Sequence, residues 1–369
     1  MTGCLLRPLL AAAAAGLAAA SPRCSPAKPH PSGMHELKMS LQGLQRRALL
    51  YVPPGYKPDQ GVPVVVVPQA FGWTAEFNIQ HSGLLPAAAA RNISLVELDA
   101  PDLAMNVVVD GRANPLRPDD VAYTSAVLSE VDRLLCLDAR RITCVGFSRG
   151  ARFCSRLASE RSDIFAAIAA LSGIRFPRPN NATRPVPVLT FHGTQDSVNP
   201  YPGGGPPYWQ TSVDEAISGW VKFNRCRQRS YREMAARQQV YTFSRCADNA
   251  DVIFMKLSGG GHEWPDSKYA LARYPPGAPK ANDVILDFLQ DHPLPVTTNQ
   301  PVQQAPEVRS VSASRVQTET ASAPQGPGEN VSAARPGPDF RALLAAWRLG
   351  GASAAAPGAR LGRGLQPVA

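Results

Sequence analysis

The sequence predicts an α/β fold with a doubly wound, mainly parallel sheet. Short apolar segments rich in β-branched residues alternate along the chain with segments whose apolar residues recur at helical spacing. This alternation is typical of a parallel sheet with helices on both faces. The length of 369 residues accommodates one large domain with chain left over. We therefore expect a single domain over residues 37–293.

Each predicted element follows from its own local pattern. The strands are apolar runs bounded by turn residues, and they cover residues 47–52, 62–68, 93–99, 141–146, 164–171, 186–192 and 252–258. The helices are predicted at residues 119–137, 149–160, 212–225 and 281–290. In the first of these helices the apolar residues from Val121 to Leu135 recur at near-helical spacing, so we expect that face to lie in the core.

The most informative motif is Gly146-Phe147-Ser148-Arg149-Gly150, which lies between a predicted strand and a predicted helix. A Gly-x-Ser-x-Gly sequence at such a junction is typical of the nucleophile elbow, a sharp turn that exposes the serine hydroxyl. The start of the following helix supplies backbone N–H groups and a favourable dipole for a developing oxyanion. We therefore predict that Ser148 is a nucleophile and that the N–H of Arg149 contributes to an oxyanion hole.

A serine nucleophile needs a base and an acid, which follow an elbow of this kind in the order Ser, Asp or Glu, His. Asp196 comes shortly after the strand at 186–192, and His262 lies on a glycine-rich segment after the strand at 252–258. We predict that His262 takes the proton of Ser148 and that Asp196 fixes the tautomer of His262. His192 stands at the end of the strand at 186–192, four residues before Asp196, and we expect it to order the loop that carries Asp196, the acid loop, rather than to act as the base.

At these residues the sequence resembles the secreted esterases that include polyhydroxybutyrate depolymerase-like proteins, feruloyl esterases and acetyl xylan esterases. The matching segments are the elbow, His192 to Asp196 with Pro200-Tyr201 behind it, and Gly259 to Pro265, in which three glycines lead into His-x-Trp-Pro. The resemblance covers residues 37–293. It implies the α/β-hydrolase fold and ester hydrolysis through an acyl-enzyme on Ser148, without a metal or an organic cofactor.

The chain departs from this family after the strand at 62–68. Where the family usually has His-Gly, this chain has Gln69-Ala70. The amide of Phe71 is then the candidate for the second oxyanion donor, although alanine at position 70 tolerates a positive φ less well than glycine. Because losing one oxyanion donor lowers the rate on the order of a hundredfold, the substitution bears on how active the protein is.

Aromatic residues near the predicted catalytic loops are candidates for substrate-binding walls. They are Trp264, Trp73, Tyr201 and Trp209. Trp264 precedes a proline and is an equally good candidate for a loop anchor, so both interpretations stay open. The favoured function is a secreted serine carboxylic ester hydrolase acting on polymer-linked feruloyl, acetyl or hydroxybutyryl groups. The alternatives are a weakly active or non-catalytic polysaccharide-binding protein on the same scaffold and, ranked last, a peptidase.

The two ends of the chain differ from its middle. Residues 1–20 are predicted to be a signal peptide, because Arg7 precedes an apolar run that ends in Ala18-x-Ala20. The run is too short and alanine-rich for a membrane span, so we expect secretion and no stable membrane insertion. Residues 294–369 are predicted to be a tail rich in Pro, Ser and Ala, disordered apart from a short helix at 339–349.

Cysteine usage fits an oxidising compartment. Of the seven cysteines, Cys226 and Cys246 form the predicted disulfide, on either side of an Arg/Gln-rich segment that we expect to be irregular. Cys144 is expected to be a buried small hydrophobic residue. Cys136 and Cys154 either pair or stay free, and the sequence does not assign Cys24. The Cys and His spacing does not indicate a metal site.

The charge balance limits the classes of partner. The net charge is +9, from 38 Lys and Arg against 29 Asp and Glu. Nucleic-acid binding favours a basic stripe with interleaved aromatic residues, whereas the arginines of this chain are scattered along it. We expect no nucleic-acid partner and at most a mild attraction to acidic polysaccharide or a cell surface.

Overall fold

The computed structural model describes residues 22–295 apart from 110–111, 236–237, 268–269 and 271–279. All described residues belong to one compact unit, Met1–Arg315. The predicted signal peptide at 1–20 and the tail from 296 onwards, with its expected helix at 339–349, lie outside the described residues. None of the helices in the described ranges is long and apolar enough to cross a membrane.

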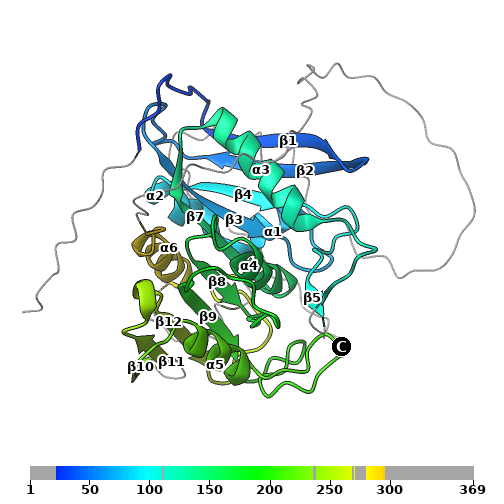
Figure 1. Ribbon diagram of the computed structural model, residues 1–369, viewed down its shortest axis with the longest axis vertical. Coiled ribbons are helices and arrows are strands. Elements are labelled where there is room, and N and C mark those ends of the chain that lie inside the picture. The colour runs from blue at the N-terminus through cyan, green and yellow to red at the C-terminus, as the bar shows by residue number, and fades with distance from the viewer. Residues whose placement is uncertain (1–21, 110–111, 236–237, 268–269, 271–279, 296–369) are drawn as a thin grey trace, which may run out of the picture. The chain divides into compact units, whose positions relative to one another are not determined.

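The elements alternate between strand and helix along most of the chain (Figure 1). The strands are β1 (Gly33–Leu41), β2 (Leu44–Val52), β3 (Val62–Pro68), β4 (Ser94–Leu98), β5 (Val108–Val109), β6 (Arg112–Ala113), β7 (Leu137–Phe147), β8 (Ile168–Leu171), β9 (Val188–Gly193), β10 (Gln228–Ala235), β11 (Gln238–Ser244) and β12 (Val252–Leu257). The α-helices are α1 (Ala75–Ser82), α2 (Leu84–Ala90), α3 (Asp120–Leu134), α4 (Arg149–Glu160), α5 (Val213–Phe223) and α6 (Ala281–Asp291), and a 3₁₀ turn, η1, covers Ala247–Asn249.

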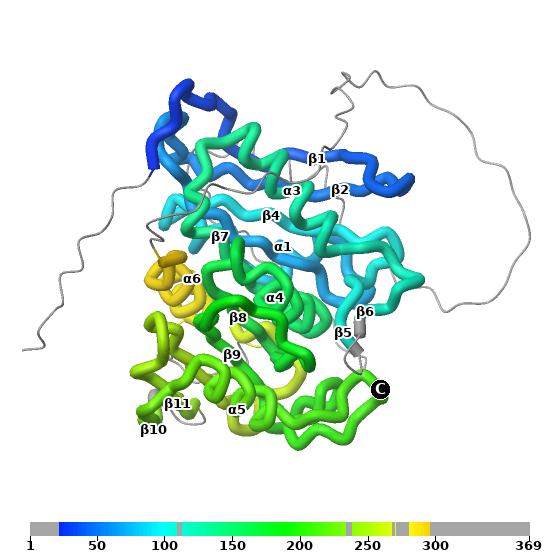
Figure 2. Tube along the Cα trace, viewed as in Figure 1, coloured from blue at the N-terminus to red at the C-terminus, as the bar shows by residue number. Residues whose placement is uncertain are grey.

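One 10-stranded sheet has the strand order β1-β2-β4-β3-β7-β8-β9-β12-β11-β10. The strands from β4 to β12 in this order pair in parallel. Antiparallel pairs close the two edges, with β1 and β2 at one end of the molecule and the β10–β11 hairpin at the other (Figure 2). This arrangement confirms the predicted α/β-hydrolase fold with its mainly parallel sheet.

The parallel strands are buried on both faces, which explains their continuous apolar sequences. In β3, Val62, Val64 and Val66 belong to the core on the side of α3, α4 and α5. Val65 and Val67 point into the second core, which α1, α2 and α6 cover. The helices therefore lie on both faces of the sheet, as the sequence predicts.

The predicted elements correspond to observed ones. Each of the seven predicted strands overlaps one of β2, β3, β4, β7, β8, β9 and β12, and the four predicted helices are α3, α4, α5 and α6. The helix predicted at 149–160 has the same bounds in the structure. The elements that the sequence did not reveal are β1, β5, β6, β10 and β11 and the short helices α1 and α2.

The segment between Cys226 and Cys246 is a β-hairpin, so the prediction of an irregular segment is wrong. Strands β10 and β11 pair from Gln228 with Ser244 to Ala235 with Gln238. β10 is the outermost strand of the sheet, and its described side chains from residue 228 to 233 are exposed. An edge strand that is exposed on both faces needs no alternation of apolar and polar residues, so its polar sequence carries no strand signal.

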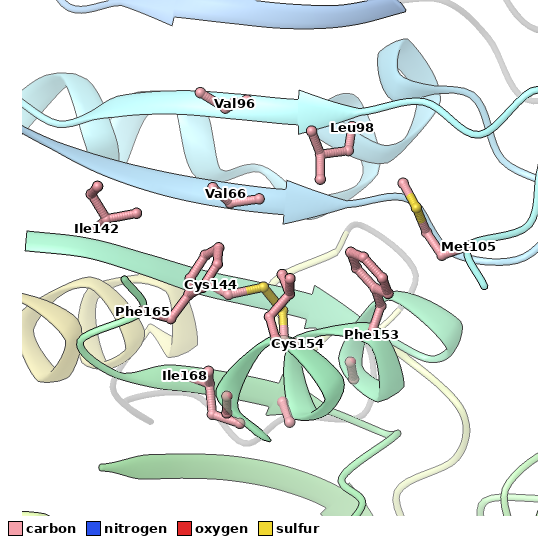
Figure 3. Packing of buried hydrophobic residues seen from close by; sticks show 14 of the residues in the cluster. Val66, Val96, Leu98, Met105, Ile142, Cys144, Phe153, Cys154, Phe165 and Ile168 are labelled. Atoms are coloured by element: carbon pink, nitrogen blue, oxygen red, sulfur yellow. A yellow bond between two sulfur atoms is a disulfide. The ribbon is translucent and has the colours of Figure 1, made fainter. Parts of the chain in front are cut away.

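Three disulfides join the six cysteines of the described residues. The predicted pair, Cys226–Cys246, is present. Cys144 is not a free hydrophobic residue as expected, because it bonds Cys154 of α4 within the core beside Phe153, Phe165 and Ile168 (Figure 3). Cys136 pairs with Cys24, which rules out the pairing of Cys136 with Cys154 that the sequence left open. These three bonds indicate folding in an oxidising compartment.

The loops that the disulfides close differ in length, and this difference predicts unequal contributions to stability. Cys24 and Cys136 are 112 residues apart, whereas Cys226 and Cys246 are 20 apart. Loop-closure entropy predicts that the double variant Cys24→Ala/Cys136→Ala loses about 1.5 kcal/mol more unfolding free energy than Cys226→Ala/Cys246→Ala. Urea unfolding of both variants beside the unaltered protein measures the difference. Equal losses would show that native-state contacts outweigh chain entropy.

Candidate active site

Ser148 occupies the turn between β7 and α4 in a conformation that few serines adopt. Its φ is 54° and its ψ is −115°. A non-glycine residue held in such a region costs on the order of 1–3 kcal/mol and persists only where its surroundings impose it. Here the Ser148 N–H donates to Leu171 O of β8 at 2.9 Å, and the Arg152 N–H donates to Ser148 O at 3.2 Å. The serine is therefore fixed from the neighbouring strand and from its own helix.

Glycines surround this turn because other backbone atoms approach it closely. A Cβ on Gly146 would lie 2.3 Å from the carbonyl carbon of Gly150. One on Gly150 would lie 2.3 Å from Pro68 O at the end of β3, and one on Gly173 would lie 2.3 Å from Ser148 O. No side chain fits at such separations. The two glycines of the motif and Gly173 after β8 are thus required by the packing of the turn.

Asp196 and His262 meet across the ends of β9 and β12. His262 Nδ1 lies 2.8 Å from Asp196 Oδ2, and the carboxylate is fully buried. The other oxygen, Oδ1, accepts the backbone N–H groups of Val198 at 2.9 Å and Asn199 at 2.7 Å. A carboxylate accepts and does not donate, so Nδ1 carries the proton and the lone pair remains on Nε2. His262 is therefore prepared to accept a proton on Nε2.

The loops that carry these two residues are packed backbone against backbone. A Cβ on Gly193, the last residue of β9, would lie 2.2 Å from Gly260 O and 2.6 Å from Gly261 O. The Gln195 N–H also donates to Gly260 O at 2.9 Å. The glycine-rich segment before His262 is consequently held against the segment before Asp196, and this contact sets the distance between His262 and Asp196.

His192 is buried beneath the acid loop, in agreement with the loop-ordering role that the sequence predicts. Its Nε2 lies 2.8 Å from Asn199 O and 3.4 Å from Asp196 Oδ2. Burial lowers the pKa of His192, so the ring is held neutral. A neutral Nε2–H donates to Asn199 O and fixes the turn that presents Asp196. Asn199 also donates from Nδ2 to Ser172 O at 2.6 Å, which links the acid loop to the segment after β8.

His262 lies against the residue that precedes the serine. The ring centroids of Phe147 and His262 are 4.8 Å apart. Within the described part of the chain the Ser148 hydroxyl makes no hydrogen bond to His262, a contact that in many enzymes tightens only when substrate binds. The structure thus joins the predicted acid and base, and Phe147, the residue before Ser148, lies against the ring of His262.

The loop after β3 approaches the start of α4, where the predicted oxyanion donors lie. Arg149 is the first residue of α4, so its N–H has no carbonyl partner within the helix. In the loop after β3, Gln69 Oε1 accepts the Ala100 N–H at 2.9 Å, and Ala70 O accepts the Trp73 N–H at 3.3 Å. The positive φ of this loop falls on Gly72, at 75°, and not on Ala70. The alanine therefore imposes no strain of the kind expected from the sequence.

The side chain of Phe71, the second predicted oxyanion residue, faces solvent with 65% of its surface exposed. Its ring lies 5.8 Å from the guanidinium of Arg149. Only the main chain of Phe71 is therefore a candidate for contact with an oxyanion.

A cavity of about 470 Å³ opens beside His262. Trp73 lines it, and the Trp73 ring stacks on Phe147 with centroids 5.4 Å apart. The full lining consists of Trp73, His81, Phe147, Gln195, Ser197, Gly261, His262, Glu263 and Ser267. His81 and Phe147 were not singled out from the sequence, because a lone histidine and the variable position of the elbow motif carry no signal of their own.

The other three predicted wall residues lie elsewhere. Trp264 is fully buried and donates from Nε1 to Asn282 Oδ1 at 2.8 Å, so of the two interpretations left open the structure favours the loop anchor. Trp209 is also buried, stacked on His192 at 5.7 Å. The Tyr201 hydroxyl donates to Asp214 at 2.6 Å, and its ring lies 6.2 Å from His192. Trp209 and Tyr201 therefore pack against His192 beneath the loop that carries Asp196, instead of lining the cavity.

No protein-family model matches the chain. The chain is 28% identical over 279 residues to the putative esterase NocK of Nocardia uniformis subsp. tsuyamanensis, a match that covers 68% of this chain and 80% of that protein. It is 26% identical over 247 residues to feruloyl esterase B of Piromyces equi, covering 60% of this chain and 44% of that protein.

A solved acetyl xylan esterase from Aspergillus awamori superposes with a TM-score of 0.49 at 12% identity, covering 69% of this chain and 99% of that one. The sequence relatives confirm the predicted resemblance to esterases, feruloyl esterases among them. The chain spans less than half the length of feruloyl esterase B.

The different environments of Trp264 and Trp73 predict different costs for the same substitution. Trp264→Phe removes buried volume and leaves Asn282 Oδ1 without its donor, so the unfolding free energy should fall by about 2–4 kcal/mol. Trp73→Phe retains an aromatic ring at the cavity wall and should cost less than about 1 kcal/mol. Denaturant unfolding of both variants makes the comparison. Similar losses would contradict the assignment of Trp264 as a buried anchor.

Proposed function

We propose that this chain is a serine carboxylic ester hydrolase that works through a Ser148–His262–Asp196 triad. The observation that carries the proposal is the 2.8 Å contact between His262 Nδ1 and the buried Asp196 carboxylate. Ser148 adopts the elbow conformation, and its neighbour Phe147 lies against His262. The esterase relatives support it independently of the geometry.

The proposed reaction starts from the contact between His262 Nδ1 and Asp196. Nε2 accepts the proton of Ser148 Oγ while Oγ attacks the ester carbonyl carbon, and the developing imidazolium is stabilised by Asp196. The N–H of Arg149, together with an N–H from the loop after β3, stabilises the negative charge on the carbonyl oxygen. Collapse of this intermediate breaks the bond to the alcohol oxygen, which takes the proton from Nε2. Water then attacks the acyl-enzyme by the same sequence of transfers and releases the acid.

The shape of the site favours an aromatic or similarly flat acyl group. Trp73 and Phe147 stack beside His262 and form an apolar wall of the 470 Å³ cavity. A feruloyl ring presents a matching flat face, and aromatic pairs of this kind gain about 0.5–1.5 kcal/mol beyond the area that they bury. Feruloyl groups linked to polysaccharide are therefore our first choice of substrate, ahead of acetyl and hydroxybutyryl groups.

We also propose that the protein acts outside the cell. The three disulfides are typical of proteins that fold in an oxidising compartment, and the first twenty residues have the pattern of a signal peptide. A polysaccharide is too large to enter a cell, so an enzyme that acts on it has to be secreted.

Removing the nucleophile tests the triad. Ser148→Ala should lower kcat for p-nitrophenyl acetate and methyl ferulate by about 10⁴-fold or more, and Asp196→Asn should lower it by about 10³–10⁴-fold. Ser129→Ala, a change at an exposed serine of α3, serves as the control and should retain full activity. Initial rates and labelling by a fluorophosphonate report on the same serine.

A second candidate function is a polysaccharide-binding protein with little or no activity, suggested by Gln69-Ala70 on the oxyanion loop. If the folded, unaltered protein hydrolyses neither ester and does not react with the fluorophosphonate, this result would favour the binding function and contradict the esterase proposal.

The cavity wall predicts a selective effect of Trp73. Trp73→Ala should raise KM for methyl ferulate by about tenfold, because the flat face against which the ring would pack is lost. KM for p-nitrophenyl acetate, whose acyl group is a single methyl carbon beside the carbonyl, should change little. Steady-state kinetics on the two esters test this. An equal change in both values would place the feruloyl ring elsewhere.

A further inference from the structure

A second cavity, of about 330 Å³, lies beside α4 and is lined by four arginines. Arg152 and Arg156 come from α4, and Arg175 and Arg178 come from the segment after β8. Among the described residues that line this cavity there is no acidic side chain. Its lining shares no residue with that of the cavity beside His262. Arginines that are scattered along the sequence are thus gathered at one place in the fold.

Arg152 differs from the other buried arginines in having no anionic partner. Three arginines are buried in the described part of the chain. Arg46 bonds Asp120 at 2.7 Å, and Arg156 bonds Glu160 at 2.7 Å. Arg152 is only 6% exposed, yet within the described ranges its Nε and Nη1 are buried without a hydrogen-bond acceptor. A buried charge without a partner is unfavourable unless something else supplies one.

The groups that act on Arg152 are two further cations and one aromatic ring, and none of them is a carboxylate. The cations that act on it are Arg149 and Arg175, and its guanidinium lies 4.5 Å from the centre of the Tyr208 ring. Burial, and then these two arginines, lower the pKa of Arg152 to about 9. The side chain remains protonated near neutral pH, so the cavity keeps an unneutralised positive charge.

The wall of this cavity is held in place by specific contacts. Arg175 donates to the carbonyl oxygens of Thr211, at 3.1 Å, and Tyr208. The Arg175 guanidinium also lies 3.8 Å from the centre of the Trp209 ring, and Trp209 Nε1 donates to Pro200 O at 2.8 Å. Residues 200–211 are therefore fixed around the cavity.

We propose that this cavity binds a small oxyanion, namely a carboxylate, sulfate or phosphate group, which the guanidinium of Arg152 holds. The planar fork of a guanidinium matches two oxygens of such a group. A volume of about 330 Å³ is at the lower end of the range of small-molecule sites, which suits a single sugar unit. The oxyanion belongs either to a free anion or to an acidic sugar, and both present the same chemistry to Arg152.

Calorimetric titration of the full chain at constant ionic strength tests this site. The probes are glucuronate, its neutral analogue glucose, and inorganic phosphate. Saturable binding of glucuronate without binding of glucose or phosphate supports a carboxylate carried by a sugar. Saturable binding of phosphate supports a free oxyanion. If neither anion binds saturably to the folded protein, the proposal is overturned.

Substitutions of single arginines test whether the anion binds at Arg152. Arg152→Met should weaken binding by about tenfold or more, since a charge-assisted hydrogen bond is lost, and it should not lower the unfolding temperature in anion-free buffer. Arg133→Met removes the same charge from an exposed position of α3 and should bind as the unaltered protein does. Arg152→Lys keeps the positive charge but lacks the planar set of N–H donors of a guanidinium, so it should also weaken binding.

Two further outcomes decide the proposal. Binding that is equal in the Arg152 and Arg133 variants would overturn the assigned site. Ser148→Ala should bind the anion unchanged, because the site does not depend on the proposed ester chemistry. A failure of one proposal is therefore distinguishable from a failure of the other.

Discussion

The architecture of this protein depends on close contacts between backbone segments that no side chain separates. Gly150 brings the first turn of α4 against the carbonyl oxygen at the end of β3, and Gly173 brings the segment after β8 against Ser148. Gly193 brings the acid loop against the glycines before His262. The Gly193 contact joins the segments that carry Asp196 and His262, and the Gly150 contact joins the segments that carry the candidate oxyanion donors. Their relative positions are therefore set by main-chain packing, which is stiffer than contact between flexible side chains.

Much of the fold is predictable because the central strands are buried on both faces. The valines of β3 leave no other interpretation than a buried strand. The edges are different, since β10 gains its structure from pairing with β11 and its own residues are exposed. Helix α1 is only eight residues long, and α2 carries Pro86 in its first turn. Both helices are too short to be stable in isolation, so their stability depends on tertiary contacts.

The candidate catalytic residues are predictable for a related reason: their order along the chain and their positions after strands follow from the sheet itself. Which aromatic residues line the cavity does not follow from the sequence. Trp264 and Trp209 have the same side chain as Trp73, but both are fully buried: Trp264 bonds Asn282, and Trp209 stacks on His192. Of the three cysteine pairs only Cys226–Cys246 was predicted, whereas Cys144 and Cys154 meet only when α4 packs on β7. The sequence also does not reveal that Arg152 lacks an anionic partner, because this depends on which side chains surround it in the fold.

The bond between Cys144 and Cys154 has a consequence for how the molecule assembles. It joins residues on either side of Ser148 that are 10 positions apart, so the serine sits inside a small covalent ring. Closing so short a loop sacrifices little chain entropy compared with closing the 112-residue loop between Cys24 and Cys136. In oxidative folding this ring can form while distant strands are still unpaired. The turn around the serine would then be a local template, onto which the later segments of the chain are added.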